Sequence, residues 1–291
     1  MRSERGQGTV EWVGLVTLVS LVLLAAVAAG VPVPGMTIAQ SLADRILCAA
    51  SLADGCGDEP RLIAAYGTEV GELVRRHMPT LVFEQGSRAV PVDFRRCRDS
   101  ECGDASGDGM VHRTDAGLPV SVFVHVVDCR AGTETPGADC SGERAGNLYV
   151  QYWTYYADSA TLRGVPIAGA LGYHADDWEG VQLRFRSDGS VDERASSHHG
   201  YNYFLTDVNW ASDAGVVPHD GWGQETHLLF VSGGSHAGSA IAAPETHRFT
   251  PGRRVHLIPL EQIAAESRER FAISPPWLKH VWSDPEAEGT D

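Results

Sequence analysis

Six runs of alternating apolar residues dominate the chain after Pro79. They are TLVFE (80–84), VSVFVHVV (120–127), NLYVQYWTYY (147–156), VQLRFR (181–186), HLLFVS (227–232) and RRVHLIPL (253–260). A period of two is typical of strands, and Gly, Pro, Asp and Ser separate the runs. No helical stretch alternates with them, which disfavours a doubly wound parallel sheet. The pattern predicts a mainly β fold, an antiparallel β-sandwich with peripheral helices.

Two stretches ahead of these runs have the period of a helix. They cover residues 37–52 and 59–77. Apolar residues recur there every three or four positions, as on one face of an amphipathic helix. We therefore expect a short helical neck over residues 36–78, followed by the β domain over 79–291. The polar tail SDPEAEGTD (283–291) is predicted to be disordered.

An uncharged apolar run extends from Trp12 to Gly30 near the N-terminus. As a helix of about 1.5 Å per residue it would be roughly 29 Å long, enough to span a bilayer. Arg2 and Arg5 precede it, so the positive-inside rule places the N-terminus in the cytoplasm. Residues 1–35 are thus predicted to be a leader with a single transmembrane helix, and the remaining chain to be extracytoplasmic at the cell membrane.

The residues ahead of this run resemble a type IV prepilin leader of the Flp/TadE kind. The similarity rests on Gly6, Gln7 and Glu11, followed directly by the apolar helix. It implies cleavage after Gly6 and partners in a pilus or secretion machinery. Two alternatives remain open: a plain membrane anchor, and a signal peptide cleaved near Ala26 and Ala28, which would release a secreted protein.

The cysteines indicate in which compartment the chain folds, and the net charge indicates which partners are disfavoured. The six cysteines fall in local pairs: Cys48 and Cys56, Cys97 and Cys102, Cys129 and Cys140. Their even number suggests disulfides formed outside the cytoplasm, with connectivity left open, while six buried thiols are the alternative. The formal net charge of −15 disfavours nucleic acid as a partner.

Three acids lie at the start of one strand-like run, in GYHADDWEGVQLRF (172–185). Strand alternation puts Asp177 and Glu179 on the face that carries Val181, and buried carboxylates are costly without partners. With His174 upstream they form a candidate divalent-cation site, which oxygen ligands would bias to Ca²⁺ or Mg²⁺ and a histidine would extend to Mn²⁺ or Zn²⁺. Gly180 suggests a β-bulge, which would weaken the assignment of Asp177 and Glu179 to the face of Val181. An acidic, solvated loop is the competing interpretation.

The same segment resembles two known families. HADDWE (174–179) is similar to the G-H-R-H-D-W-E heptapeptide of necrosis- and ethylene-inducing-like proteins and to the H-E-G-D-W-E signature of the vacuolar protein sorting 62 family. Further similar elements follow in order: QYWTYYADS (151–159), HHGY (198–201), GGSHA (233–237) and PPW…WSDP (275–285). The likeness covers most of residues 79–286.

This resemblance implies a β-sandwich with a cation cleft at one end. Carried over by position, the ion ligands would be Asp158, His174, Asp177 and Glu179. Asp176 stands where the necrosis-inducing family has a second His, so we expect it at the cleft rim. The family cleft binds a sugar headgroup of a membrane lipid, which implies a lectin-like partner here, a glycan or a polar lipid headgroup.

Other residues are expected to line the same cleft, and they leave two further functions open. The expected lining residues are Asp176, Trp178, His198, His199, Ser235 and His236. One of the three histidines could act as a general base in a metal-dependent hydrolase. A mainly structural minor pilin is the other alternative. We expect a binding module rather than an enzyme.

Overall fold

The computed structural model divides the chain into two compact units, residues 1–57 and 58–291. It describes residues 58–84, 89–97, 120–159, 174–197, 200–201, 221–232, 235–240, 248–249, 255–267 and 270–287. The predicted leader, apolar run and first two cysteines lie outside these ranges. Among the helices within them, none combines the length and the hydropathy that crossing a membrane requires.

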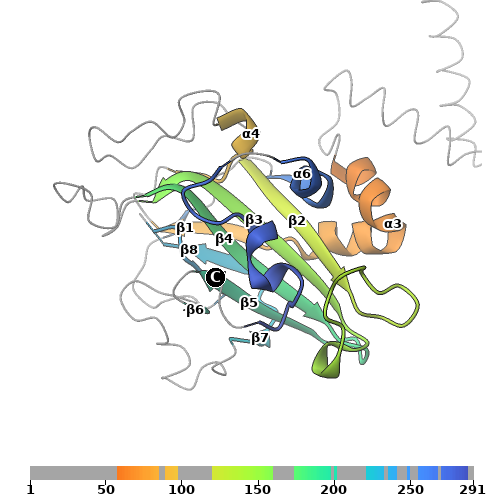
Figure 1. The fold of residues 1–291 in the computed structure, drawn as a ribbon. Coiled ribbons are helices and arrows are strands. Elements are labelled where there is room, and N and C mark those ends of the chain that lie inside the picture. Colours follow the sequence, from red (N-terminus) through yellow and green to blue (C-terminus); the bar gives the residue numbers. More distant parts are fainter. Residues whose placement is uncertain are drawn as a thin grey trace, which may run out of the picture. The chain divides into compact units, whose positions relative to one another are not determined.

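Two sheets form the frame of the second unit (Figure 1). The larger has the order β11-β2-β3-β4-β5-β6, with β7 paired to β5. Its strands are β2 (Val120–Asp128), β3 (Leu148–Ser159), β4 (His174–Phe185), β5 (Val191–Ser197), β6 (Gly200–Tyr201), β7 (Gly223–Gln224) and β11 (Val255–Pro259). The smaller sheet has the order β10-β1-β8-β9, from β1 (Thr80–Glu84), β8 (Leu228–Val231), β9 (Gly238–Ser239) and β10 (Arg248–Phe249).

All six strands predicted from alternation are present, and the mainly β fold is confirmed. Two pairings differ from the antiparallel expectation, because β1 runs parallel to β8 and β11 parallel to β2. Strand β5 escaped the pattern because its sequence, VDERASS, is polar. Glu193 and Arg194 are nevertheless buried there, which only their tertiary partners make tolerable.

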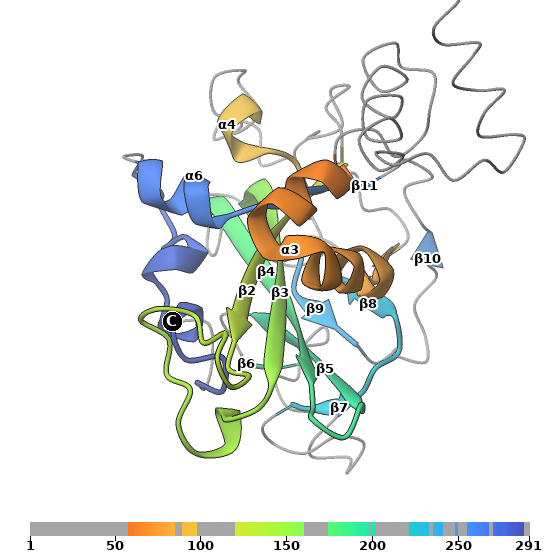
Figure 2. The same cartoon turned by 90° about the vertical axis from the view of Figure 1, so that its right-hand side faces the viewer.

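The two sheets share one hydrophobic core. Phe83 of β1, Val231 of β8 and Tyr152 of β3 belong to the same buried cluster. Helix α3 (Asp58–His77) adds Leu62 and Val74 to this cluster and packs beside β11 (Figure 2). The Tyr152 hydroxyl donates a hydrogen bond to the carbonyl of Val74 at 2.7 Å. The helix predicted as part of a neck is therefore integral to the β unit.

The outer face of the larger sheet carries a buried polar row. Its four members are opposite one another on consecutive strands: His125 (β2), Gln151 (β3), Gln182 (β4) and Arg194 (β5). All four are almost fully inaccessible to solvent. Buried polar groups need hydrogen-bond partners, so some other segment has to cover this face.

The C-terminal segment provides that cover (Figure 1, dark blue). It contains two short 3-10 turns, η4 (Pro276–Leu278) and η5 (His280–Trp282). Gln151 donates to the carbonyl of Val281 at 2.7 Å, and Arg194 donates to that of Pro285 at 2.7 Å. The ring of His125 stacks on Trp282 with 3.4 Å between centroids. Each contact joins one strand of the sheet to the end of the chain.

Residues 283–287 differ from the disordered tail expected for 283–291. Asp284 is held by a two-bond pair with Arg144, at 2.5 and 2.7 Å. Glu286 accepts hydrogen bonds from Tyr149, Arg184 and Trp222. A polar composition predicts disorder only where it finds no partners, and here the sheet supplies them.

One predicted disulfide is confirmed in the connection from β2 to β3. Cys129 and Cys140 are bonded, with Cα atoms 5.1 Å apart. The same connection contains the 3-10 turn η3 (Gly142–Arg144). The remaining cysteines, Cys48, Cys56, Cys97 and Cys102, lie outside the side chains that the structure describes. Two further short helices lie in the described part of the unit, α4 (Phe94–Cys97) and α6 (Glu261–Glu266).

Candidate functional site

The end of β3 and the start of β4 gather three carboxylates on one face. The register sets Tyr156 opposite Asp177, Thr154 opposite Glu179 and Asp158 opposite Ala175. Directly opposed residues of an antiparallel pair share a face, so Asp158, Asp177 and Glu179 point to the same side of the sheet. Their exposed fractions are 1%, 5% and 6%. This arrangement agrees with the core-directed parity that alternation predicts for the two acids of β4.

His236 lies against these acids from the smaller sheet. It sits in the connection between β8 and β9 with a left-handed backbone, φ 55°, and is 2% exposed. Its Nδ1 is 2.7 Å from Oδ2 of Asp177, and its ring stacks on Tyr156 at 3.9 Å between centroids. An imidazole held by a carboxylate on one side and an aromatic ring on the other has a fixed orientation.

Glu179 is a buried carboxylate, and one of its two oxygens lacks a hydrogen-bond partner among the described residues. Burial and then the charge of neighbouring Asp177 raise its pKa well above the ordinary range, and Lys279 acts in the opposite direction. Its Oε2 accepts no hydrogen bond from the part of the chain that the structure describes. Leaving such an oxygen unbonded in the interior costs free energy of folding, which a cation would recover.

His174, the histidine that the family resemblance makes a ligand, is placed differently. The register sets it opposite Ser159, on the face away from Asp158. Its Nδ1 lies 3.3 Å from the carbonyl oxygens of Ala175 and Asp176. Of the two sequence-predicted histidines that the structure describes, it is therefore His236 that contacts the acidic face.

Asp176 is buried rather than exposed at a rim. It accepts hydrogen bonds from the hydroxyl of Tyr155 at 2.8 Å and from the amide of Ala272 at 2.7 Å. These contacts place it on the opposite face from Asp177. Its backbone is left-handed, with φ 58°, which is uncommon for a residue other than glycine. Asp176 thus fastens the chain near residue 272 onto the strand pair.

Gly180 does not mark a bulge. The register continues through it, opposite Trp153 on β3 and Ser196 on β5. A Cβ atom at this position would lie 3.0 Å from the indole ring of Trp153, so a larger residue would require that ring to shift. The irregularity of β4 is instead at Asp176, before the two acids.

Trp178 belongs to an aromatic cluster on the same face as Asp176. Its neighbours, at 5.0–5.9 Å between ring centroids, are Phe94, Phe123, Tyr155, Phe271 and Trp277. Their tilted and edge-to-face geometry is that of core packing. Ser235 is half-buried beside His236. His198 and His199 lie outside the described residues.

The donor set of the acidic face suits a hard divalent cation. Asp158, Asp177 and Glu179 offer carboxylate oxygens, the ligands that Ca²⁺ and Mg²⁺ prefer, and the unbonded Oε2 of Glu179 fits that chemistry. However, no three of the four predicted ligands have ligand atoms that all lie within 4.8 Å of one another. Among the described residues, the ligand atoms of His77, Glu225 and His227 do lie that close together.

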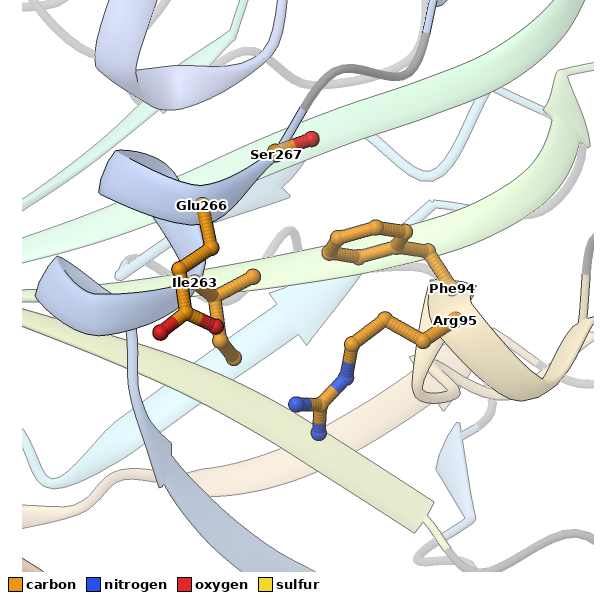
Figure 3. A pocket seen from close by; sticks show the side chains of 5 residues that line it. All are labelled: Phe94, Arg95, Ile263, Glu266 and Ser267. Atoms are coloured by element: carbon orange, nitrogen blue, oxygen red, sulfur yellow. The ribbon is translucent and has the colours of Figure 1, made fainter.

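Two surface pockets lie away from the acidic face. One, of about 180 Å³, is lined by Phe94 and Arg95 of α4 and by Ile263, Glu266 and Ser267 at α6 (Figure 3). Its only described guanidinium, Arg95, is already paired with Asp93 at 2.6 Å. A neighbouring pocket of about 540 Å³ shares Arg95 and Ile263. Among the residues that the structure describes, none of the sequence-predicted site residues lines either pocket.

Comparison with known proteins gives distant structural neighbours. One is a solved structure described as a toxin fold for microbial attack and plant defense, with 18% identity, a TM-score of 0.34, and 66% of this chain matched to 74% of that one. Another is NLPPya in complex with mannosamine, also at 18% identity and a TM-score of 0.34, covering 71% and 84%. No family model and no curated protein matches the chain.

Proposed function

We propose that the chain is a divalent-cation-binding β domain that recognises a glycan or a polar lipid headgroup through the bound ion. Asp158, Asp177 and Glu179 are the proposed ion ligands. The ion, Ca²⁺ or Mg²⁺, would supply a positive centre to which sugar hydroxyls or a headgroup bind. The sequence elements that resemble the necrosis-inducing and vacuolar protein sorting 62 families include the strands that carry these acids, and this similarity supports the proposal.

The observation that carries this proposal is the pair of buried carboxylates on β4. Asp177 and Glu179 are two residues apart on one face and both nearly inaccessible, and burial together with the charge of Asp177 raises the pKa of Glu179. A sheet core has no packing use for two such acids, since apolar side chains of similar size would be more stable there. Binding a cation is the role that accounts for both of them.

His236 has a positioning role in this proposal. Its Nδ1 is hydrogen-bonded to Oδ2 of Asp177, which leaves Oδ1 of the same carboxylate for an ion. Partners of metal-binding carboxylates commonly fix their orientation in this way. Because His236 is packed on Tyr156, that orientation is rigid.

Calorimetric titration of the EDTA-treated full-length chain with Ca²⁺ and Mg²⁺ tests the proposal. The double variant Asp177→Asn, Glu179→Gln removes two negative charges with little change of shape, and we expect it to abolish binding. A matched control, Asp188→Asn with Glu134→Gln, removes two exposed charges and should bind as the parent does. Equal affinity in both double variants would show that the ion ligands are misassigned.

Recognition of the ligand is tested in a second titration. Mannosamine, neutral hexoses and vesicles that carry glycosylated lipids are offered to the Ca²⁺-loaded protein and to the protein in EDTA. We expect binding of a sugar or headgroup only with the ion present. Binding that persists in EDTA would separate ligand recognition from the cation.

A metal-dependent hydrolase is the second candidate. It is favoured by the pairing of His236 with a carboxylate at 2.7 Å, an arrangement that general bases use. Its test is turnover of phosphoester and glycoside panels with each divalent metal, lost in His236→Ala. Without turnover under any metal, the binding role stands alone.

For the N-terminal region we propose a single membrane-spanning helix from Trp12 to Gly30, after a prepilin-like leader. The β domain would then be displayed outside the cell membrane, with a pilus or secretion machinery as partner. Mass spectrometry of the mature N-terminus tests this. A chain that begins at Gln7 supports prepilin processing, and one that begins near Ala29 indicates a cleaved signal peptide.

A further inference from the structure

We propose a second metal site, for Zn²⁺, formed by His77, Glu225 and His227. It is separate from the acidic face and uses softer donors. His77 ends helix α3, while Glu225 and His227 belong to the turn that joins β7 to β8. Segments about 150 residues apart in sequence thus meet at one point.

The three side chains already converge. The Nδ1 atoms of His77 and His227 lie 2.8 and 3.0 Å from the same carboxylate oxygen, Oε1 of Glu225. All three ligand atoms are within 4.8 Å of one another. Two imidazoles and one carboxylate are a known ligand set of catalytic zinc sites, in which the ion binds nitrogen at about 2.0–2.1 Å. A zinc ion would replace the protons that these groups now share.

The surroundings hold each ligand in place. The ring of His77 is packed edge-on against Phe185 of β4, with 4.9 Å between centroids. The carbonyl of His227 accepts a hydrogen bond from the amide of Thr80 at 2.9 Å, and its backbone is left-handed, with φ 59°. A residue other than glycine adopts this conformation at a cost, which is repaid where its side chain has a fixed task.

A buried glutamate supports the turn that carries two of the ligands. Glu193 accepts hydrogen bonds at Oε2 from the amide and the hydroxyl of Thr226, at 2.6 and 2.9 Å, and so supports the middle of the turn. Its Oε1 has no hydrogen-bond partner among the described residues. Glu193 therefore fixes the turn that carries Glu225 and His227 to strand β5.

Exposure of the ligands leaves one side of the site open. The side chains of His77 and Glu225 are 15% and 9% exposed, whereas that of His227 is 60% exposed. Three protein ligands with a solvent-facing side leave a fourth position for water. The imidazoles select Zn²⁺ over Ca²⁺, because imidazole is a poor ligand for hard cations.

The two sites are at opposite ends of β4. Asp177 and Phe185, which mark them, are eight residues apart, or roughly 26 Å along a strand. Substitutions at one site should therefore leave the other unchanged. This separation makes the zinc site testable independently of the proposed glycan or headgroup binding.

The test is a Zn²⁺ titration of the EDTA-treated full-length protein by calorimetry, with Co²⁺ as a spectroscopic probe of the ligands. We expect His227→Ala to weaken Zn²⁺ binding at least about 10–100-fold, since even outer-shell partners have effects of that size. Glu225→Gln should do the same. Because His227 is exposed, its substitution leaves the fold intact.

Two matched variants complete the experiment. His280→Ala removes another exposed histidine and should bind Zn²⁺ as the parent does. Asp177→Asn with Glu179→Gln should also retain it. The proposal is overturned if the parent binds no Zn²⁺, or if binding survives both His227→Ala and Glu225→Gln. Loss of Zn²⁺ in the Asp177, Glu179 variant alone would likewise overturn it, by placing the ion on the acidic face.

Discussion

The imidazole ring of His236 lies face to face with the phenol ring of Tyr156, with 9° between their planes. Tyr156 is opposite Asp177 on β4, and His236 is hydrogen-bonded to that acid. The connection between β8 and β9 is thereby fastened to the larger sheet at its acidic face. One residue of the smaller sheet both covers and orients a proposed ion ligand.

Replacing His236 by Phe separates these two roles. The aromatic ring keeps the stacking on Tyr156, while the hydrogen bond to Asp177 is lost. We expect Ca²⁺ or Mg²⁺ affinity to fall about 10–100-fold, the usual effect of removing a partner of a metal ligand. Calorimetric titration of the full-length chain measures this.

His174→Ala is the comparison for that experiment. The family resemblance makes His174 a ligand, whereas the strand register places it on the other face. We expect its cation affinity to match the parent. A large loss in His174→Ala with none in His236→Phe would reverse the assignment of the two histidines.

Arg194 joins the outer face of the larger sheet to the C-terminal segment, through the carbonyl groups of Pro285 and Ala287. It is 1% exposed, between the rings of Tyr201 and Trp222 at 4.0 and 4.3 Å, and it also donates to Gln182 at 2.7 Å. Arg194→Met keeps the apolar stem but removes the hydrogen bonds to Gln182 and to the carbonyl groups of residues 285 and 287. We therefore expect a loss of about 3–5 kcal/mol in the free energy of unfolding.

Arg186→Met is the matched control, read by urea unfolding. The side chain of Arg186 is 43% exposed and pairs with Asp192 at the surface. Surface pairs of this kind contribute about 0–1 kcal/mol. Equal losses in the free energy of unfolding would mean that the buried Arg194 contributes no more to stability than the surface Arg186.

Six of the strands and helix α3 could be predicted because each has a regular apolar period. The polar row could not, because its members come from four strands and are meaningful only once the register is known. Strand β5 was missed for the same reason, since the burial of Arg194 depends on carbonyl groups of residues 285 and 287. Sequence period indicates which face is apolar, but not which polar residues a distant segment will cover.

Stability should depend on pH through Glu193. Burial raises its pKa to about 7, although hydrogen bonds from Thr226 lower it. The folded state therefore binds the proton more tightly than the unfolded chain, whose Glu titrates near 4.5. The stabilising contribution is complete below about pH 4.5 and is lost as pH rises through about 7, at up to roughly 1.4 kcal/mol per pKa unit.

Urea unfolding between pH 5 and 8, in EDTA, compares the parent with Glu193→Gln. The parent should lose stability over this range more steeply than the variant, because a glutamine does not titrate. Parallel pH profiles would show that Glu193 has the same affinity for protons in the folded and unfolded chains.

The Cys129–Cys140 disulfide should stabilise the loop between β2 and β3. It joins residues 11 positions apart, and loop-closure entropy for such a span amounts to about 2–3 kcal/mol. We expect Cys129→Ala with Cys140→Ala to lower the free energy of unfolding by that amount. The double variant is preferable to a reducing agent, which would act on every disulfide. A change below about 0.5 kcal/mol would contradict the estimate.

At the acidic face, the parity of Asp177 and Glu179 was readable from the sequence, because alternation is a local property. The position of His236 was not, since it depends on how the smaller sheet packs on the larger. Asp176 illustrates the limit of alternation: its left-handed backbone and its bond to the amide of Ala272 become visible only in three dimensions. His77, Glu225 and His227 carried no sequence signal, because they come from two distant segments.

The C-terminal segment has a consequence for biosynthesis. The carbonyl acceptors of Arg194 lie at Pro285 and Ala287, and β11 pairs with β2 from far earlier in the chain. A nascent chain therefore cannot complete the larger sheet and its cover until residues 255–287 have left the ribosome, and such long-range pairing is intrinsically slow. A product that ends before residue 285 would lack the carbonyl acceptors of Arg194 and would leave this buried guanidinium without them.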